Sequence, residues 1–331
     1  MALAFTGFIA GALVSLATSW ILVTRLERVG QRFGFSEALL GVVAALAADA
    51  PEITAAVSAL SRHQRALGAG VVIGSNVFNL AALLGLGAVV SGFIMLHRRV
   101  VVLGGFVAMW TALCCVAVVT GLITALVGLV LSAVVLTCYL VVLGLDQKTL
   151  ARLALPREVT TWISSAVSEE EMELESAIRP SRGTPLDAAV AFAALVVVVL
   201  ASAAMEWGAS KLGHHFHVAG AITGGLVLAA VTSLPNAVAA VHLASSGRGA
   251  AAFSTALTSN NLNVIAGLLI PGTVIGLASP SAAGNLSAAA YLVITALVLV
   301  LAYASSGLNR RSGWAIIAGY VIFVSWLVAV S

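Results

Sequence analysis

The chain has 331 residues, of which 61% are hydrophobic and 9% are charged. This composition excludes an ordinary water-soluble domain, in which about a quarter of the residues would be charged. The net charge of +3 reflects where the basic residues lie along the chain, as described below, and does not indicate a nucleic-acid partner.

Ten apolar segments long enough to cross a bilayer follow one another along the chain, since a transmembrane helix needs about 20 mostly apolar residues. They are 2–24, 36–61, 67–92, 100–121 and 123–143, then 187–210, 219–244, 250–271, 286–304 and 314–330. They are continuous runs, whereas the strands of a membrane barrel would alternate over about ten residues. The sequence therefore predicts an all-α integral membrane protein of about ten transmembrane helices.

The polar stretch 145–186 divides the chain into a first five-helix repeat, 1–144, and a second, 187–331. The glutamates between 169 and 175 lack the spacing of an EF-hand loop, so we interpret 158–176 as a solvated helix, with Ca²⁺ sensing as the alternative. The sequence predicts that this stretch is a cytoplasmic loop.

The basic residues predict the orientation, because short cytoplasmic loops retain lysine and arginine. With the N-terminus outside, only Arg62, Arg65 and Lys211 of the 16 basic residues face the outside. Both termini are then external, and the expected location is the plasma membrane.

An internal repeat joins the two halves. Residues 36–86 align without a gap on residues 220–270, at an offset of 184 residues, so that Pro51 falls on Pro235. Because each half has an odd number of spans, the second half enters the membrane from the opposite side and the repeat is inverted. Inverted repeats of this kind place discontinuous helices and an ion site near the membrane midplane in transporters.

Pro51 and Pro235 mark the predicted breaks in the second and seventh helices. A proline lacks the backbone N–H and clashes with the preceding turn, which frees carbonyls that can coordinate a cation inside a cavity. A simple kink at each proline is the alternative.

Acidic residues within the predicted membrane depth are Asp49, Glu52 and Glu206. A buried carboxylate is costly, and a hard cation such as Ca²⁺ or Na⁺ prefers oxygen ligands. Asp49 and Glu52 therefore either share a cation or hold a proton, unless they only hydrogen-bond the broken helices. For Glu206 the alternatives are an interfacial pair with Lys211 and an entrance residue that attracts cations.

Four short motifs carry a resemblance to a known family. They read Ala47-Ala48-Asp49-Ala50-Pro51-Glu52, Gly74-Ser75-Asn76-Val77-Phe78-Asn79, Val231-Thr232-Ser233-Leu234-Pro235-Asn236 and Thr258-Ser259-Asn260-Asn261-Leu262-Asn263. These segments resemble the alpha-repeats of the calcium/cation antiporter superfamily, which includes sodium/calcium and calcium/proton exchangers.

The resemblance implies an ion site made from the motif residues Glu52, Ser75, Asn79, Thr232, Ser233, Ser259 and Asn263. Asn236 stands where family members usually carry glutamate, and Asn263 stands where the sodium/calcium branch often has aspartate. Conversely, Asp49 replaces a serine. With Asp49 and Asn236 added, the candidate cation ligands are Asp49, Glu52, Ser75, Asn79, Thr232, Ser233, Asn236, Ser259 and Asn263.

The sequence thus predicts a secondary active antiporter that exchanges Ca²⁺ for Na⁺ or H⁺. Exchange of Na⁺ or another cation for H⁺, or a transport-inactive scaffold or sensor, are the alternatives. We expect no enzyme activity, no cofactor and no nucleotide site, since a Walker A motif is absent; the expected partners are the lipid bilayer and small inorganic cations. Two carboxylates balance one Ca²⁺, two Na⁺ or two H⁺, so we expect fewer monovalent ions per Ca²⁺ than in three-carboxylate members, or protons.

Overall fold

The computed structural model describes the chain except for residues 34–36, 145–160, 163–164, 166–182 and 246–248. Most of the predicted loop 145–186, including the glutamates between 169 and 175, lies outside the described residues.

The described residues are almost entirely helical. The first half contains α1 (Ala2–Arg32), α2 (Glu37–Ala48), α3 (Ala50–Ser61), α4 (Arg65–Asn79), the π-helix η1 (Leu80–Leu86), α5 (Gly87–Ser91), the strand β1 (Phe93–Met95), α6 (Arg98–Val119) and α7 (Ala125–Gly144). The second half contains α10 (Pro185–His215), α11 (Gly220–Ile222), the π-helix η2 (Thr223–Leu228), α12 (Ala229–Ser245), α13 (Gly249–Leu262), the π-helix η3 (Asn263–Leu269), α14 (Ile270–Ile275), α15 (Ala282–Ala304), β2 (Gly307–Asn309) and α16 (Arg310–Val330).

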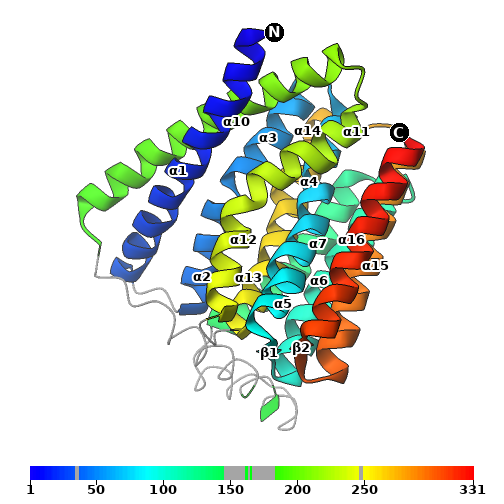
Figure 1. Ribbon diagram of the computed structural model, residues 1–331. Coiled ribbons are helices and arrows are strands. Elements are labelled where there is room, and N and C mark those ends of the chain that lie inside the picture. Colours follow the sequence, from blue (N-terminus) through cyan, green and yellow to red (C-terminus); the bar gives the residue numbers. More distant parts are fainter. Residues whose placement is uncertain (34–36, 145–160, 163–164, 166–182, 246–248) are drawn as a thin grey trace.

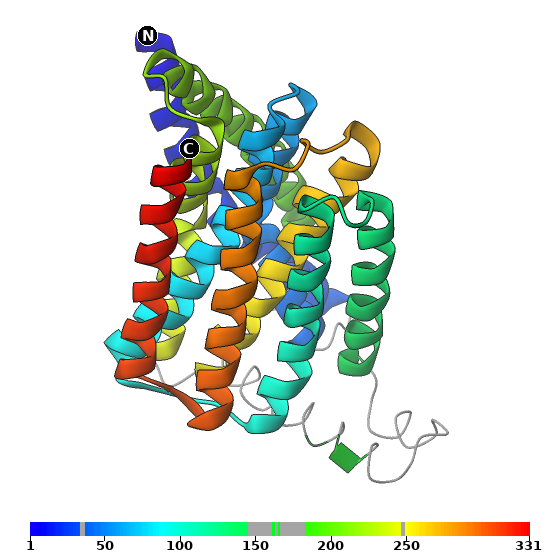
Figure 2. The same cartoon turned by 90° about the vertical axis from the view of Figure 1, so that its right-hand side faces the viewer.

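In the part of the chain that the structure describes, seven helices are long and apolar enough to cross a membrane: α1, α4 continued through η1 and α5, α6, α7, α10, α15 and α16. The remaining predicted spans are built from shorter pieces, namely α2 with α3, α11 with η2 and α12, and α13 with η3 and α14. These composite segments run alongside the long helices (Figures 1 and 2).

The two ends of the bundle are distinct (Figure 1). Both chain termini lie at one end, which we call the termini side. At the other end, the ribbon side, β1 and β2 pair antiparallel with Phe93 opposite Asn309.

The second predicted span is interrupted at Asp49, between α2 and α3. This break lies two residues before Pro51, which occupies the first turn of α3. Because a proline has no N–H, it cannot bond to the carbonyl one turn earlier, and the Ala47 carbonyl instead accepts a 3.4 Å bond from the Ser19 hydroxyl.

The interruption expected at Pro235 lies elsewhere, because α12 continues through Pro235 and the irregular part is η2, one turn upstream of the Thr-Ser motif. The Thr232 hydroxyl donates to the carbonyls of Leu228 (2.9 Å) and Ala229 (3.3 Å) at this junction. A π-helical turn accommodates one extra residue and often marks a functional site. The irregular turn of the seventh predicted span is therefore the π-helix η2, which lies upstream of Pro235.

Helices α1 and α10 pack against each other along their lengths on one flank of the bundle (Figure 1). Glycines permit the close approach, since a Cβ on Gly11 would lie 2.6 Å from the Ala201 carbonyl oxygen and one on Gly208 would lie 2.4 Å from that of Ala4. Both helices extend beyond the predicted apolar runs 2–24 and 187–210.

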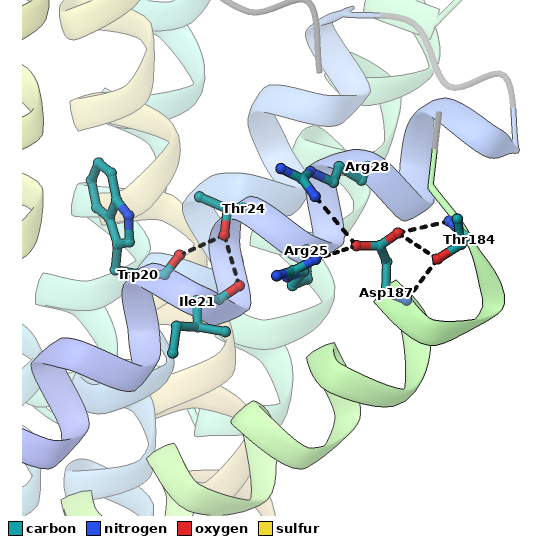
Figure 3. A network of polar contacts seen from close by, with 7 residues as sticks. All are labelled: Trp20, Ile21, Thr24, Arg25, Arg28, Thr184 and Asp187. Atoms are coloured by element: carbon teal, nitrogen blue, oxygen red, sulfur yellow. Dashed lines mark hydrogen bonds and ion pairs between the residues drawn. The ribbon is translucent and has the colours of Figure 1, made fainter. Parts of the chain in front are cut away.

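An ion pair at the ribbon side explains this extension (Figure 3). Arg25 Nη1 lies 2.6 Å and Arg28 Nη1 lies 3.6 Å from Asp187 Oδ1. Asp187 also forms a reciprocal capping box with Thr184, whose N–H and hydroxyl each donate to Asp187 Oδ2 at 2.8 Å. Neutralising the arginines lets α1 continue as a helix past its apolar segment.

The two halves meet where α4 packs against η2. A Cβ on Gly74 would lie 2.2 Å from the Gly225 carbonyl oxygen and 2.5 Å from its Cα. No side chain fits at this contact, so two backbones from opposite halves touch directly beside the motif residues.

Candidate cation site

Two carboxylates lie at the interruption of the second span. Asp49 occupies the turn between α2 and α3, and Glu52 lies in the first turn of α3. Both side chains are fully buried, and the N-terminal end of α3 favours negative charge. Within the described residues, neither carboxylate forms an ion pair with Arg, Lys or His. Their charge must therefore be balanced by protons or by bound cations.

Neutral donors from the second half hold one oxygen of each carboxylate. Asn236 Nδ2 donates to Asp49 Oδ1 at 2.8 Å and to Glu52 Oε1 at 3.4 Å. Ser259 Oγ donates to Asp49 Oδ1 at 2.7 Å, and Ser233 Oγ donates to Glu52 Oε1 at 3.1 Å. The structure thus brings the carboxylates of the first repeat against the amide and hydroxyl groups of the second.

These contacts follow the internal repeat. At the offset of 184 residues, Asp49 corresponds to Ser233 and Glu52 corresponds to Asn236. The contact of Asp49 with Asn236 and that of Ser233 with Glu52 are therefore exchanged by the relation that superimposes the two repeats. Equivalent positions of the two repeats therefore make equivalent contacts, but the acidic residues come from the first repeat and the neutral donors from the second.

A second pair of equivalent contacts joins the repeats. Asn76 Nδ2 donates to the Asn260 carbonyl at 3.0 Å, and Asn260 Nδ2 donates to the Asn76 carbonyl at 3.1 Å. These two residues are also 184 positions apart. Both residues stand in the quoted motifs, but neither is among the predicted ligands. From the sequence alone, an asparagine in such a motif can be an ion ligand or can hold two helices together by hydrogen bonds, as these two do.

Asn79 extends the hydrogen-bond network on one side only. Its Nδ2 donates to Ser259 Oγ at 3.3 Å and to Asn260 Oδ1 at 3.2 Å. The equivalent pair in the other repeat, Ser75 with Asn263, is fully buried, and the Ser75 hydroxyl and both polar atoms of the Asn263 side chain have no partner among the described residues.

Several buried oxygens of the predicted ligands have no hydrogen-bond partner within the described residues. They are Asp49 Oδ2, Glu52 Oε2, Ser75 Oγ, Asn79 Oδ1 and Asn263 Oδ1. Buried polar atoms without partners are costly and are uncommon in native proteins. Carboxylate, amide and hydroxyl oxygens are the ligands of hard cations such as Ca²⁺ and Na⁺. This donor set fits such an ion.

Thr232 is buried in the same region, but its hydroxyl donates to the carbonyls of Leu228 and Ala229 at the junction of η2 and α12 and, among the described residues, forms no hydrogen bond with either carboxylate. The described residues hold no cluster of three or more His, Cys, Asp or Glu side chains. Ligands beyond Asp49 and Glu52 must therefore be neutral oxygens.

Glu206 lies apart from this cluster. Its carboxylate is buried in α10 and pairs with Arg62 at 3.0 Å. The predicted partner Lys211 is exposed instead. Sequence spacing could not reveal the pairing, because Arg62 is brought to Glu206 only by the packing of α3 against α10.

Comparison with known proteins adds independent information. The sequence model of the family described as sodium/calcium exchanger protein matches residues 3–145 and again residues 187–329. The starts of these two equal segments, 3 and 187, are 184 residues apart, which is the offset of the internal alignment.

Solved structures of the sodium–calcium exchanger NCX_Mj share the fold. The structure soaked with zero Na⁺ and Ca²⁺ has a TM-score of 0.59 at 19% sequence identity, covering 98% of this chain and 99% of that one. The structure soaked with 100 mM Na⁺ and 10 mM Sr²⁺ has a TM-score of 0.60 at 19% identity, covering 98% of each chain.

A curated relative is "Putative antiporter CaxA" of Alkalimonas amylolytica, which is 33% identical over 82 residues. The match spans 24% of this chain and 26% of the relative. On the evidence of the family model, which covers both halves, the chain belongs to the sodium/calcium exchanger protein family.

Proposed function

We propose that this multi-pass membrane protein exchanges Ca²⁺ for Na⁺ or H⁺, and that the exchanged ions bind in turn at Asp49 and Glu52 with the neutral ligands around them. The coarser activity, antiport of cations, is that of the family. The orientation follows the basic residues, with the termini side outside the cell and the ribbon side in the cytoplasm.

The observation that carries this proposal is the set of buried oxygens without partners among the described residues, to which both repeats contribute. Each unpaired group costs about 1–3 kcal/mol, and two of the five oxygens belong to carboxylates that form no ion pair with a described basic residue. Here the paired oxygens hold the two repeats together, while the remaining oxygens are available to a cation. The five oxygens named above come from three helical segments, namely α2 with α3, α4, and α13 with η3 and α14.

The counter-ion follows from charge. Two carboxylates hold a charge of −2, which one Ca²⁺, two Na⁺ or two H⁺ would balance, and burial strongly favours a neutral site in each state. We therefore propose a cycle in which two monovalent ions exchange for one Ca²⁺. Exchange of a monovalent cation for H⁺ at the same carboxylates is the second candidate, because two adjacent buried carboxylates readily hold a proton.

The test is transport by the purified protein in liposomes. Ca²⁺ uptake is measured with an outward Na⁺ gradient, with an outward H⁺ gradient and with no gradient. We expect uptake to require one of the two gradients and to fall to background in Glu52→Gln, since this change removes a charged ligand and keeps the side-chain shape. Glu27→Gln, the same change in α1 outside the site, should transport normally.

Uptake by Glu52→Gln at the wild-type rate would remove Glu52 from the mechanism. Na⁺ uptake driven by H⁺ without any Ca²⁺ flux would favour the second candidate. A folded wild-type protein that moves none of these ions would indicate a scaffold or sensor.

A further inference from the structure

A third buried carboxylate, that of Glu206 in α10, has an unusual environment. Its Oε2 accepts a 2.8 Å bond from the Ser58 hydroxyl and lies 3.0 Å from Arg62 Nη1. Its Oε1 is buried and has no partner among the described residues. The Glu206 side chain is 0% exposed, whereas the Arg62 side chain is 40% exposed.

Glu206 lies between the candidate cation site and the termini side. Its partner Ser58 is six residues beyond Glu52 in α3, which corresponds to about 9 Å along the helix axis at 1.5 Å per residue. Arg62 caps the C-terminal end of the same helix. α3 therefore carries Glu52 at one end and the two partners of Glu206 toward the other.

A cavity of about 400 Å³ begins just beyond Glu206. Ser210 and His214 line it from α10, and they follow Glu206 at intervals of four residues, so they share its helix face. His63 and Gln64 line it from the turn between α3 and α4. Among the described lining residues there is no carboxylate, and Arg65 is the charged one, so Glu206 is the nearest acidic residue that precedes the cavity along α10.

We propose that Glu206 is an outer cation-binding residue on the route between this cavity and the Asp49–Glu52 site, and that Arg62 occupies its place when no ion is there. This inference rests on the proposed function. A cation at Glu206 would use Oε1, Oε2 and the Ser58 hydroxyl, which are all oxygens. Arg62 can leave because its long side chain is partly exposed and its guanidinium stays hydrated when it swings away.

The alternative is an ion pair that only fastens α10 to α3. The two interpretations differ in how removing Arg62 should change ion binding. In a purely structural pair, removing either partner leaves the other without its counter-charge, so both changes destabilise the protein in the same way. In a competition between Arg62 and the ion, removing Arg62 strengthens ion binding, whereas removing the carboxylate weakens it.

The experiment compares Arg62→Gln and Glu206→Gln with wild type in liposomes of defined orientation, by measuring the apparent KM for Ca²⁺ on each side. On the termini side we expect Arg62→Gln to lower this KM by about three- to fivefold and Glu206→Gln to raise it by a similar factor, the range of a partly exposed ion pair. On the ribbon side the KM should stay unchanged. Lys211→Gln, an exposed residue of α10 with the same loss of charge, controls for surface charge and should change neither value.

Thermal unfolding in detergent gives a second measurement that does not need transport. Added Ca²⁺ should raise the unfolding temperature of Arg62→Gln more than that of wild type, because the ion replaces the missing guanidinium. If Glu206→Gln does not fold, the comparison of Arg62→Gln with wild type still distinguishes an ion-binding residue from a purely structural ion pair. Equal KM shifts of one sign in both variants, or no extra Ca²⁺ stabilisation of Arg62→Gln, would overturn the inference while leaving the proposed function intact; a wild type without any cation flux would overturn both.

Discussion

Asn76 and Asn260 illustrate how one residue type serves different purposes in the same motif. Each donates its side-chain amide to the backbone carbonyl of the other, so they brace α4 against α13 at the centre of the molecule. Asn79 also contacts the opposite repeat, through the bonds that its Nδ2 donates to Ser259 and Asn260, whereas neither polar side-chain atom of Asn263 has a partner among the described residues. The position of an asparagine in the motif therefore does not decide between brace and ligand.

The brace predicts a loss of stability in both variants. Asn76→Ala and Asn260→Ala each strand a carbonyl of the other repeat, so each should lower the free energy of unfolding by about 1–3 kcal/mol. Asn260→Ala should cost more, because it also removes the acceptor of the bond that Asn79 Nδ2 donates. Thermal unfolding in detergent measures the effect. The control is Asn285→Ala in α15, whose amide oxygen has no partner among the described residues. A large loss in one variant and none in the other would contradict an equivalent brace.

At the residue scale, polar groups are rare in apolar helices and the repeat marks them twice, so the sequence alone predicted that both carboxylates lie near polar residues of the second repeat. Ser233, Asn236 and Ser259 do contact them. The sequence could not show that Asn236 contacts both Asp49 and Glu52. That contact spans 184 residues between Asn236 and Glu52, and only packing between the two halves creates it. The pair of Arg62 with Glu206 was hidden for the same reason.

At the scale of helices, apolar length predicted where the spans lie, but other forces decide where they end. α1 reaches Arg32, and Asp187 offsets part of the charge of its arginines Arg25 and Arg28 where the helix passes its apolar segment. A hydropathy window counts those arginines only as unfavourable. Likewise, a proline indicated that the seventh span is irregular, but the π-helical turn lies at Thr223–Leu228, since the carbonyl contacts of Thr232 and the packing of Gly225 against Gly74 set its position.

The contact of α4 with η2 gives a prediction about packing. Gly74→Ala would place a methyl carbon 2.2 Å from the Gly225 carbonyl oxygen, so the two repeats would have to separate next to the candidate ligands Ser75 and Asn79. We expect loss of both transport and thermal stability. Overpacking of this kind typically costs about 1–3 kcal/mol or more, and backbone atoms cannot move aside as a side chain can.

The matched control is Gly319→Ala in α16, where the nearest atom to the new methyl is a side-chain carbon of Ile294 at 3.5 Å. This variant should fold and transport like wild type. Normal Ca²⁺ uptake by Gly74→Ala would mean that α4 and η2 do not need to touch for function.

At the scale of the whole molecule, the inverted repeat predicts the place of the site and leaves its charge undetermined. Equivalent positions make equivalent contacts, since Asp49 meets Asn236 as Ser233 meets Glu52. The charge is nevertheless confined to the first repeat. An antiporter built this way can keep a symmetric route for alternating access, and under the proposed exchange the number of carboxylates would set how many monovalent ions balance one Ca²⁺.

This dependence of stoichiometry on charge can be measured as a voltage effect. If wild type exchanges two monovalent ions for one Ca²⁺, the Ca²⁺ ratio at which net flux stops should not depend on membrane potential. Asn236→Glu replaces a donor to both carboxylates with a third acid, so three monovalent ions neutralise the site whereas one Ca²⁺ leaves one negative charge. If Ca²⁺ crosses without a further cation, one net charge moves per cycle, which corresponds to about 2.3 kcal/mol per 100 mV, and the zero-flux ratio should shift by about fiftyfold per 100 mV. A ratio that stays independent of potential in this variant would mean that one monovalent ion crosses together with Ca²⁺.

The double variant Asp49→Ser with Asn236→Glu separates the number of carboxylates from their position. It restores two carboxylates, one in each repeat, with serine and glutamate at the positions where they stand in the resembling family. Its zero-flux ratio should again be independent of a potential imposed by K⁺ and valinomycin. A wild-type ratio that shifts with potential would show that charge enters the cycle elsewhere, and Glu206 would then be the first carboxylate to remove, because its Oε1 is buried without a partner among the described residues.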